Sequence, residues 1–160
     1  MTKDMVSISS LRSPADAEAF RALNTAWIEE LFALEEEDRR VLGDPLQTII
    51  APGGDVLFAR DDDTAAVLGC VALIPAAGGR CELNKMAVAP AARGRGIGQA
   101  LMLAAIERAR ALGATSLFLG SSTKLPNAVR LYERVGFRHV DPATLGMPYA
   151  RADVFMAMDI

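Results

Sequence analysis

The fold is decided by residues 82–98, which read ELNKMAVAPAARGRGIG. The stretch from Arg80 to Ala89 follows a pair of glycines and predicts a strand that runs directly into the loop after it. The stretch from Gly96 to Leu112 is rich in alanine and leucine, and Gly113 follows it, so it predicts a long helix. A strand, a glycine-rich loop and a helix therefore succeed one another without interruption.

The loop from Pro90 to Gly98 has the composition of an anion site. A helix start leaves about four backbone N–H groups unpaired and carries roughly half a positive charge, and a pyrophosphate satisfies both. Glycines remove β-carbons that would hold phosphate oxygens away, and arginines add charge-assisted hydrogen bonds. The loop closes with Arg93-Gly94-Arg95-Gly96-Ile97-Gly98.

Two other phosphate motifs have different spacings. A dinucleotide fold requires G-x-G-x-x-G with an acidic residue about 20 positions later, and a P-loop requires G-x-x-x-x-G-K-[ST]. Neither spacing occurs here. The remaining alternative is a glycine-rich turn that only connects a strand to a helix, and the two arginines make it the less attractive one.

The flanking sequence predicts a mixed sheet with helices on its faces. Ser13-Pro14 is a good helix start, and apolar residues from Phe20 to Leu31 follow at helical spacing. A second, acidic helix is predicted over Glu35 to Leu42. Strands are predicted at Val56–Ala59, Ala66–Ile74, Ser116–Leu119 and Asp153–Asp159, and a short helix at Asn127–Val135.

This order places the helices first, then three strands, and then helices alternating with strands, which predicts an α/β chain with a mixed sheet. No repeat, linker or low-complexity segment divides it, so residues 1–160 are expected to form one domain.

Composition limits the classes of partner. Of the 160 residues, 51% are apolar and 23% charged, and the formal net charge is −3, which gives no footprint for nucleic acid or an anionic membrane. No apolar run reaches about 20 residues and no secretion pattern opens the chain, so a cytoplasmic location is expected. Cys70 and Cys81 are expected to be buried thiols. With one histidine, His139, and no cluster at ligand spacing, no metal is expected.

Three motifs in order resemble the GNAT superfamily of N-acetyltransferases. Residues 93–98 match its R/Q-x-x-G-x-G/A motif, residues 82–90 resemble its fourth strand, and Leu131-Tyr132-Glu133-Arg134-Val135-Gly136-Phe137 resembles its L-Y-x-x-x-G-F segment. The resemblance implies a central, mostly antiparallel sheet flanked by about four helices. It also implies acetyl-CoA as co-substrate, and such folds are often dimers, so a homodimer is possible.

The resemblance further implies where the cofactor binds. Main-chain groups of Met86 and Val88, with Ala87 between them, would pair with the pantetheine arm, and the amides of residues 93–98 would take the pyrophosphate. Relatives usually carry an asparagine seven positions before the tyrosine, whereas this chain has Leu125 there. Asn127 either substitutes for it or caps the short helix.

Acetyl transfer to an amine needs a base, an acid for the departing thiolate and stabilisation of the carbonyl oxygen. Tyr132 is the candidate acid and cofactor contact, although a tyrosine packed on a buried helix face would suit the spacing equally well. Glu82 is the candidate base, and its alternative is a strand-end carboxylate facing solvent. The N–H of Val88 or Ala87 is the candidate carbonyl contact. Direct attack is expected, with Cys81 as a possible nucleophile otherwise.

Candidate acceptor contacts are Trp27, Glu30, Tyr149 and Arg151, with Glu29 beside them. Carboxylates would suit a cationic amine, whereas Arg151 would suit an acid, and packed aromatic rings with solvated charges are the alternative. The leading hypothesis is an acetyltransferase acting on a primary amine of a small molecule or peptide. A non-catalytic acyl-CoA-sensing module and a nucleotide-binding protein are the alternatives.

Overall fold

The computed structural model describes residues 6–145 and 150–160. Seven strands form one sheet in the order β1-β2-β3-β4-β5-β7-β6. The strands are β1 Val6–Ser10, β2 Asp55–Asp61, β3 Val67–Pro75, β4 Arg80–Val88, β5 Ser116–Ser121, β6 Arg138–His139 and β7 Val154–Asp159. The α-helices are α1 Pro14–Leu31, α2 Glu36–Gly43, α3 Ile97–Ala111 and α4 Pro126–Val135. Short π and 3-10 segments lie at Leu46–Ile50, Ala77–Gly79, Pro90–Ala92 and Pro142–Thr144.

The sheet is mostly antiparallel, as the resemblance implied. Every neighbouring pair of strands runs antiparallel except β4 and β5, which run parallel. The strands predicted at Val56–Ala59 and Ala66–Ile74 are present as the antiparallel pair β2 and β3. The expected mixed α/β fold is therefore confirmed.

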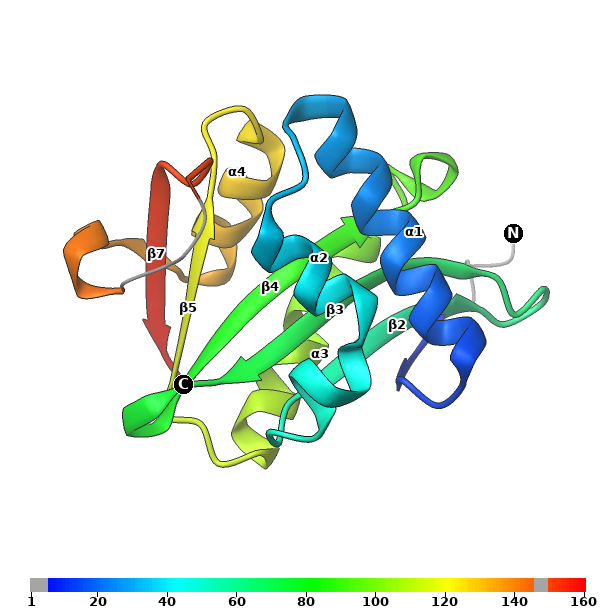
Figure 1. The fold of residues 1–160 in the computed structure, drawn as a ribbon, viewed down its shortest axis with the longest axis horizontal. Helices are drawn as coiled ribbons and strands as arrows, with labels where there is room; N and C mark the ends of the chain where they lie inside the picture. The colour runs from blue at the N-terminus through cyan, green and yellow to red at the C-terminus, as the bar shows by residue number, and fades with distance from the viewer. Residues whose placement is uncertain (1–5, 146–149) are drawn as a thin grey trace.

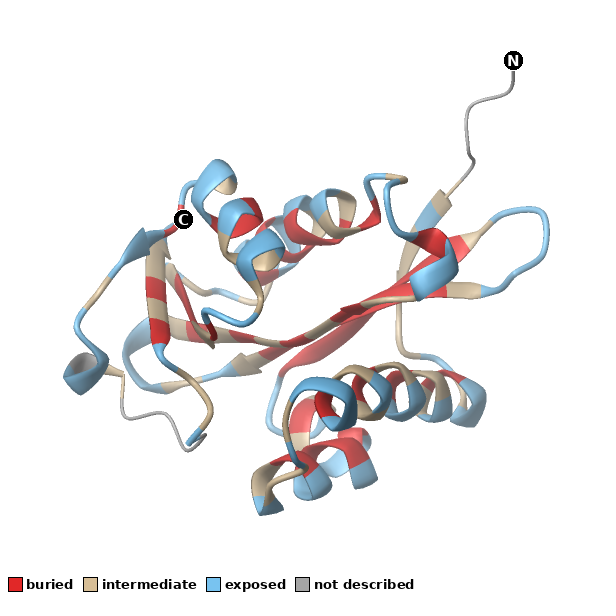
Figure 2. Ribbon diagram, turned by 90° about the horizontal axis from the view of Figure 1, so that it is seen from above, coloured by how far each residue is buried: buried red, intermediate tan, exposed pale blue. Residues whose placement is uncertain are grey.

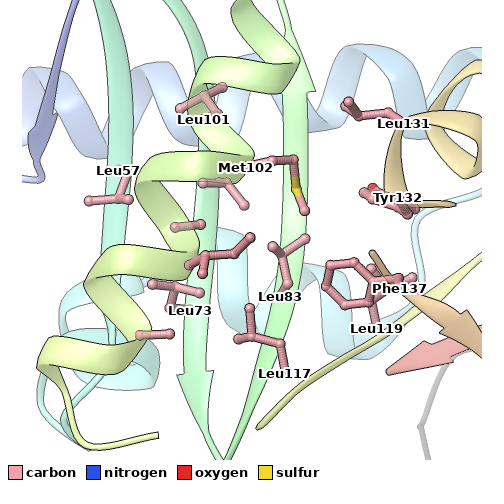
Figure 3. Packing of buried hydrophobic residues seen from close by; sticks show 14 of the residues in the cluster. Leu57, Leu73, Leu83, Leu101, Met102, Leu117, Leu119, Leu131, Tyr132 and Phe137 are labelled. Atoms are coloured by element: carbon pink, nitrogen blue, oxygen red, sulfur yellow. The ribbon is translucent and has the colours of Figure 1, made fainter. Parts of the chain in front are cut away.

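Helices cover both faces of the sheet. α1 and α2 lie over one face (Figure 1), and in the orthogonal view the buried side of each helix is turned towards the sheet (Figure 2). One core cluster packs α1 and α2 against β2 and β3 through residues such as Phe20, Ile28 and Phe58. The other lies under α3 and α4, where Met102, Leu119 and Tyr132 belong to one apolar layer (Figure 3). The sheet thus separates two cores.

α1 forms where the sequence predicts it. The Ser13 side chain accepts a hydrogen bond from the Asp16 N–H, and proline occupies the first turn. The Asp16 carboxylate also takes two hydrogen bonds of 2.8 Å from Arg60 of β2. The Arg60 hydrogen bond, set against the cost of burial, lowers the pKa of Asp16. This buried pair fastens the start of α1 to the sheet.

The expectation that helices come first is wrong, because β1 precedes α1. β1 is an edge strand of five residues, in which Val6 and Ile8 alternate with serines and pack against the core under α3, so its apolar alternation covers only two apolar positions. β6 is only two residues long, too short for any periodic pattern. Both strands exist through pairing with distant neighbours.

Gly54→Ala is expected to destabilise the fold. A β-carbon there would lie 2.2 Å from the Leu73 carbonyl oxygen and 2.8 Å from that of Ile49, both main-chain atoms. Relief requires moving β3, so the free energy of unfolding should fall by about 3 kcal/mol, measured by urea denaturation. Gly43→Ala is the matched control, since nothing lies within 4 Å of its β-carbon position. Equal unfolding midpoints for the two variants would contradict this expectation.

Candidate functional site

β4 and β5 separate part of the way along the sheet. They pair only at Arg80 with Ser116, Cys81 with Leu117 and Glu82 with Phe118. Beyond these pairs the two strands diverge (Figure 1), while β4 continues to Val88 beside β3. In a strand paired on one side only, alternate N–H and C=O groups point to the open side. Residues 83–88 therefore present main-chain donors and acceptors to the space between the strands.

A cleft of about 810 Å³ occupies this divergence. Residues 82–88 of β4 line it, α1 contributes one wall, and the end of β5 with the start of α4 contributes the other. The glycine loop closes one end of the cleft. Most of the predicted site is gathered here: Trp27, Glu30, Glu82, Met86, Ala87, Val88, Arg93, Gly94, Gly96, Ile97, Gly98, Asn127, Tyr132 and Arg151.

The loop end has the features of an anion site. Gly94 and Gly96 have φ values of 83° and 75°, which L side chains rarely adopt. Gly96 is the N-cap of α3, and no side chain caps this helix. Its first N–H groups therefore have no intrahelical or capping partner and carry the positive end of the helix dipole.

The two loop arginines lie differently. Arg93 is exposed and lines the cleft. Arg95 is not among the lining residues, and its guanidinium lies 3.7 Å from the Asp61 carboxylate at the end of β2. The sequence could not separate the two roles, because alternation along a loop does not fix which side chain turns towards a cavity.

A bulge in β4 changes which residues share a face. Lys85 has a φ of 55°, and the register with β3 shifts opposite it, between Cys70 and Ala72. Leu83 packs in the core under α3, whereas Ala87, four residues later, packs in the core under α1 and α2. An unbroken strand would place both on one face. The bulge thus turns Lys85 towards α2.

Lys85 ends in a buried ion cluster. Its Nζ lies 2.9 Å from Oδ1 of Asp38 in α2, and both side chains are fully buried. Asp38 also accepts two hydrogen bonds from Arg151, of 2.6 and 2.7 Å, and one from the Glu35 N–H. Burial alone would raise the pKa of Asp38, but Arg151, the Glu35 amide and Lys85 lower it to about 2. The carboxylate is therefore ionised at any physiological pH.

Glu82 lies next to this cluster. Burial raises the pKa of its carboxyl to about 7, with the Lys85 charge opposing the rise and the Glu37 charge adding to it. Its Oε2 accepts a 3.0 Å hydrogen bond from Asn84 Nδ2. Glu82 is half-buried, and its carboxyl lines the cleft from the interior of β4. A carboxyl with a pKa near neutrality exchanges protons readily under physiological conditions.

Tyr132 lines the cleft from α4 and packs edge-on against Phe137, with ring centroids 5.9 Å apart (Figure 3). Burial raises the pKa of its phenol, so the hydroxyl carries its proton at neutral pH. Cys81 is buried as well. Burial, followed by the Glu82 charge, raises the pKa of its thiol to about 11, so it lacks the thiolate that a nucleophile requires.

The acceptor candidates are partly engaged with one another. Arg151 is held by Asp38 and Glu35, and its guanidinium lies 5.8 Å from the ring centroids of Trp27 and Phe32. Trp27 and Glu30 line the cleft from α1, whereas Glu29 does not. Tyr149 lies outside the described residues.

The suggestion that Asn127 caps α4 is wrong. Leu125 occupies the N-cap position without a side-chain cap, and Asn127 lies within the first turn, where its Oδ1 accepts from Arg130. Sequence reasoning missed Asp38, Asn84 and Lys85 as site residues. The available signal was an asparagine and a lysine in the interior of β4, between the apolar residues Leu83 and Met86.

In residues 6–145 and 150–160, no helix is long and apolar enough to cross a membrane. Within the same ranges, no group of three or more histidine, cysteine, aspartate or glutamate side chains is arranged to hold a metal ion.

Solved structures of other proteins share the architecture of this chain. A GNAT-family acetyltransferase from Staphylococcus aureus superimposes with a TM-score of 0.87 at 18% identity, covering 97% of this chain and 99% of that one. N-acetylglutamate synthase from Neisseria gonorrhoeae, solved with coenzyme A and N-acetylglutamate, gives a TM-score of 0.72 at 22% identity and covers 99% of this chain and 36% of its own. The fold is that of the GNAT acetyltransferases.

Sequence comparison identifies the family itself. The acetyltransferase (GNAT) family model matches residues 17–137. A Schizosaccharomyces pombe protein described as an uncharacterized N-acetyltransferase is 34% identical over 146 residues, which is 89% of this chain and 88% of that protein. This chain belongs to the acetyltransferase (GNAT) family.

Proposed function

We propose that this protein transfers the acetyl group of acetyl-CoA to a primary amine of a small molecule or peptide by direct attack. The observation that carries the proposal is the open edge of β4, which leads to the uncapped start of α3 within one cleft. An extended, amide-bearing ligand with a diphosphate fits these two features together. Bound acetyl-CoA supplies the activated thioester.

The chain offers binding groups for each part of that cofactor. Met86 and Val88 provide main-chain pairing along β4, with Ala87 between them, and the amides of residues 93–98 provide the anion site. Arg93 adds a positive charge at the exposed end, and Asn127 a polar group at the start of α4. These contacts are mostly main-chain, so they depend on backbone shape more than on side-chain identity.

Glu82 and Tyr132 divide the proton transfers. Glu82 accepts a proton from the acceptor amine as its nitrogen bonds to the acetyl carbon, and its pKa of about 7 suits this task. Tyr132 donates its proton to the departing sulfur as the thioester C–S bond breaks. Its phenol is protonated at neutral pH, as an acid must be. The N–H of Ala87 or Val88 contacts the carbonyl oxygen.

The acceptor proposed here is a cationic amine rather than an acid. Arg151, the group that would recognise a carboxylate, is engaged with Asp38 and Glu35. Glu30 and Glu82 remain in the lining as carboxylates, with the Trp27 ring beside them. A cation can interact with both carboxylates and an aromatic face.

A thiol-release assay with acetyl-CoA tests the function. Polyamines, aminoglycosides and peptide N-termini are expected to release thiol faster than acidic amino acids, with mass spectrometry confirming one added acetyl group on nitrogen. If the protein binds acetyl-CoA but acetylates none of these amines, the proposed enzyme activity is wrong and an acyl-CoA-sensing module is the better interpretation. Stabilisation by ATP but not by acetyl-CoA in a thermal-shift comparison would contradict both.

A further inference from the structure

The side chain of Asn84 is held from two sides. Its Oδ1 accepts hydrogen bonds from the Lys85 main-chain N–H at 2.7 Å and from Lys85 Nζ at 3.4 Å. With the carbonyl end facing these donors, the Nδ2 end donates to Glu82 Oε2 at 3.0 Å. The orientation of the amide therefore follows from the donors around it.

The bulge in β4 makes this arrangement possible. Glu82 and Asn84 are two residues apart and share a face of the strand, and the left-handed conformation at Lys85 brings the next side chain to the same face. Without the bulge, Lys85 would point to the opposite core. One face of β4, under α2, therefore carries three successive polar contacts: Glu82 with Asn84, Asn84 with Lys85, and Lys85 with Asp38.

The far end of this chain of contacts is fixed firmly. Lys85 pairs with Asp38, and Asp38 is held in turn by Arg151 and the Glu35 amide. Both Asp38 and Lys85 are buried, where polar side chains keep their geometry because no water competes for their hydrogen bonds. Lys85 is thus a fixed support for the Asn84 amide.

We propose that Asn84 is the positioning residue of the acceptor site, holding Oε2 of Glu82 so that Oε1 is left to take the proton of the amine. The inference rests on the proposed role of Glu82 as base. Asn84 acts through Glu82 and makes no contact with the reacting atoms. Lys85, Asp38 and Arg151 carry the support for this hydrogen bond.

The hydrogen bond from Asn84 is also expected to affect the protonation of Glu82. An N–H donor to a carboxylate favours its ionised form, so loss of Asn84 should raise the pKa of Glu82 further. The other charges that act on Glu82 are Lys85 on the same strand and Glu37 on α2, with Arg151 next to Lys85. These groups stay in place when only the asparagine is changed.

The experiment measures kcat/KM against pH for Asn84→Ala, for the isosteric Asn84→Asp, for Glu82→Gln and for the double variant Asn84→Ala/Glu82→Gln. Asn84→Ala should move the acidic limb of the kcat/KM profile upward by about one pH unit. This shift lowers kcat/KM about fivefold at pH 7. Asn84→Asp removes the donor, adds a like charge and should move the limb at least as far. In the Glu82→Gln background, Asn84→Ala should have no further effect on kcat/KM.

The outcomes separate two failures. If Glu82→Gln keeps the wild-type limb, the base has been assigned wrongly, while thiol release itself stands. If Glu82→Gln abolishes the limb but both Asn84 variants keep it unshifted, the positioning role alone is overturned. The same loss from Asn84→Ala in both backgrounds would also overturn it. Thermal unfolding and acetyl-CoA affinity provide the structural control, and Asn84→Asp provides the test if the alanine variant does not fold.

Discussion

Tyr132→Phe is expected to lower kcat by about a hundredfold or more, the usual contribution of one general acid. The substitution removes only the hydroxyl and keeps the ring that packs against Phe137, so the core under α4 should remain intact. The departing thiolate then has to leave without a proton from Tyr132. The effect should appear in kcat at saturating acetyl-CoA and acceptor, measured by thiol release.

The affinity of the variant for acetyl-CoA gives the control for that experiment. Because the proposed cofactor contacts are largely main-chain groups of β4 and the loop, acetyl-CoA should raise the melting temperature of Tyr132→Phe almost as much as that of the wild type. Full turnover by the variant would remove Tyr132 from the mechanism and leave it as a core residue.

Glu82→Gln is expected to remove the acidic limb of the kcat/KM profile and to lower the plateau by about a hundredfold. The base must be ionised to accept a proton, and its pKa is about 7, so wild-type activity should rise as the pH increases through 7 and level off above about 8. Glutamine has no such titration, so the limb should disappear.

The acceptor amine also titrates, and the measurement must separate it from the enzyme. Two acceptors whose amine pKa values differ by about two units should be compared. A limb that belongs to Glu82 stays near pH 7 with both, whereas one that belongs to the amine moves with the acceptor. If the limb of the wild type moves with the pKa of the acceptor amine, and the profile of Glu82→Gln is unchanged, water takes the proton instead of Glu82.

The glycine-loop end of the cleft could be predicted because its determinants are local. A strand, a loop and a helix in direct succession, with glycines where φ is positive, are visible in one continuous stretch, residues 80–112. Backbone amides at a helix start do not depend on distant partners. The α1 helix was equally visible, since Ser13 and Pro14 form its cap and first turn within the same short stretch.

The part of the cleft beside the Asp38 cluster could not be predicted in this way. The Asp38 cluster joins residues more than a hundred positions apart, as in the pairing of Arg151 with Asp38, and no local pattern announces such a contact. It also depends on the left-handed backbone at Lys85, a conformation that sequence alone rarely indicates for lysine. Arg151 is an example. Its charge would suit an acidic acceptor, but in the fold its guanidinium pairs with Glu35 and Asp38.

The short pairing of β4 with β5 has a mechanical consequence. Three residue pairs connect a four-stranded part of the sheet to a three-stranded part, so the junction resembles a hinge at one end of an open wedge. A ligand lying along the free side of β4 would fill the space between β4 and β5. It would then contact both the four-stranded and the three-stranded part of the sheet. The freedom of the two parts to move relative to each other would then decrease as this space is filled.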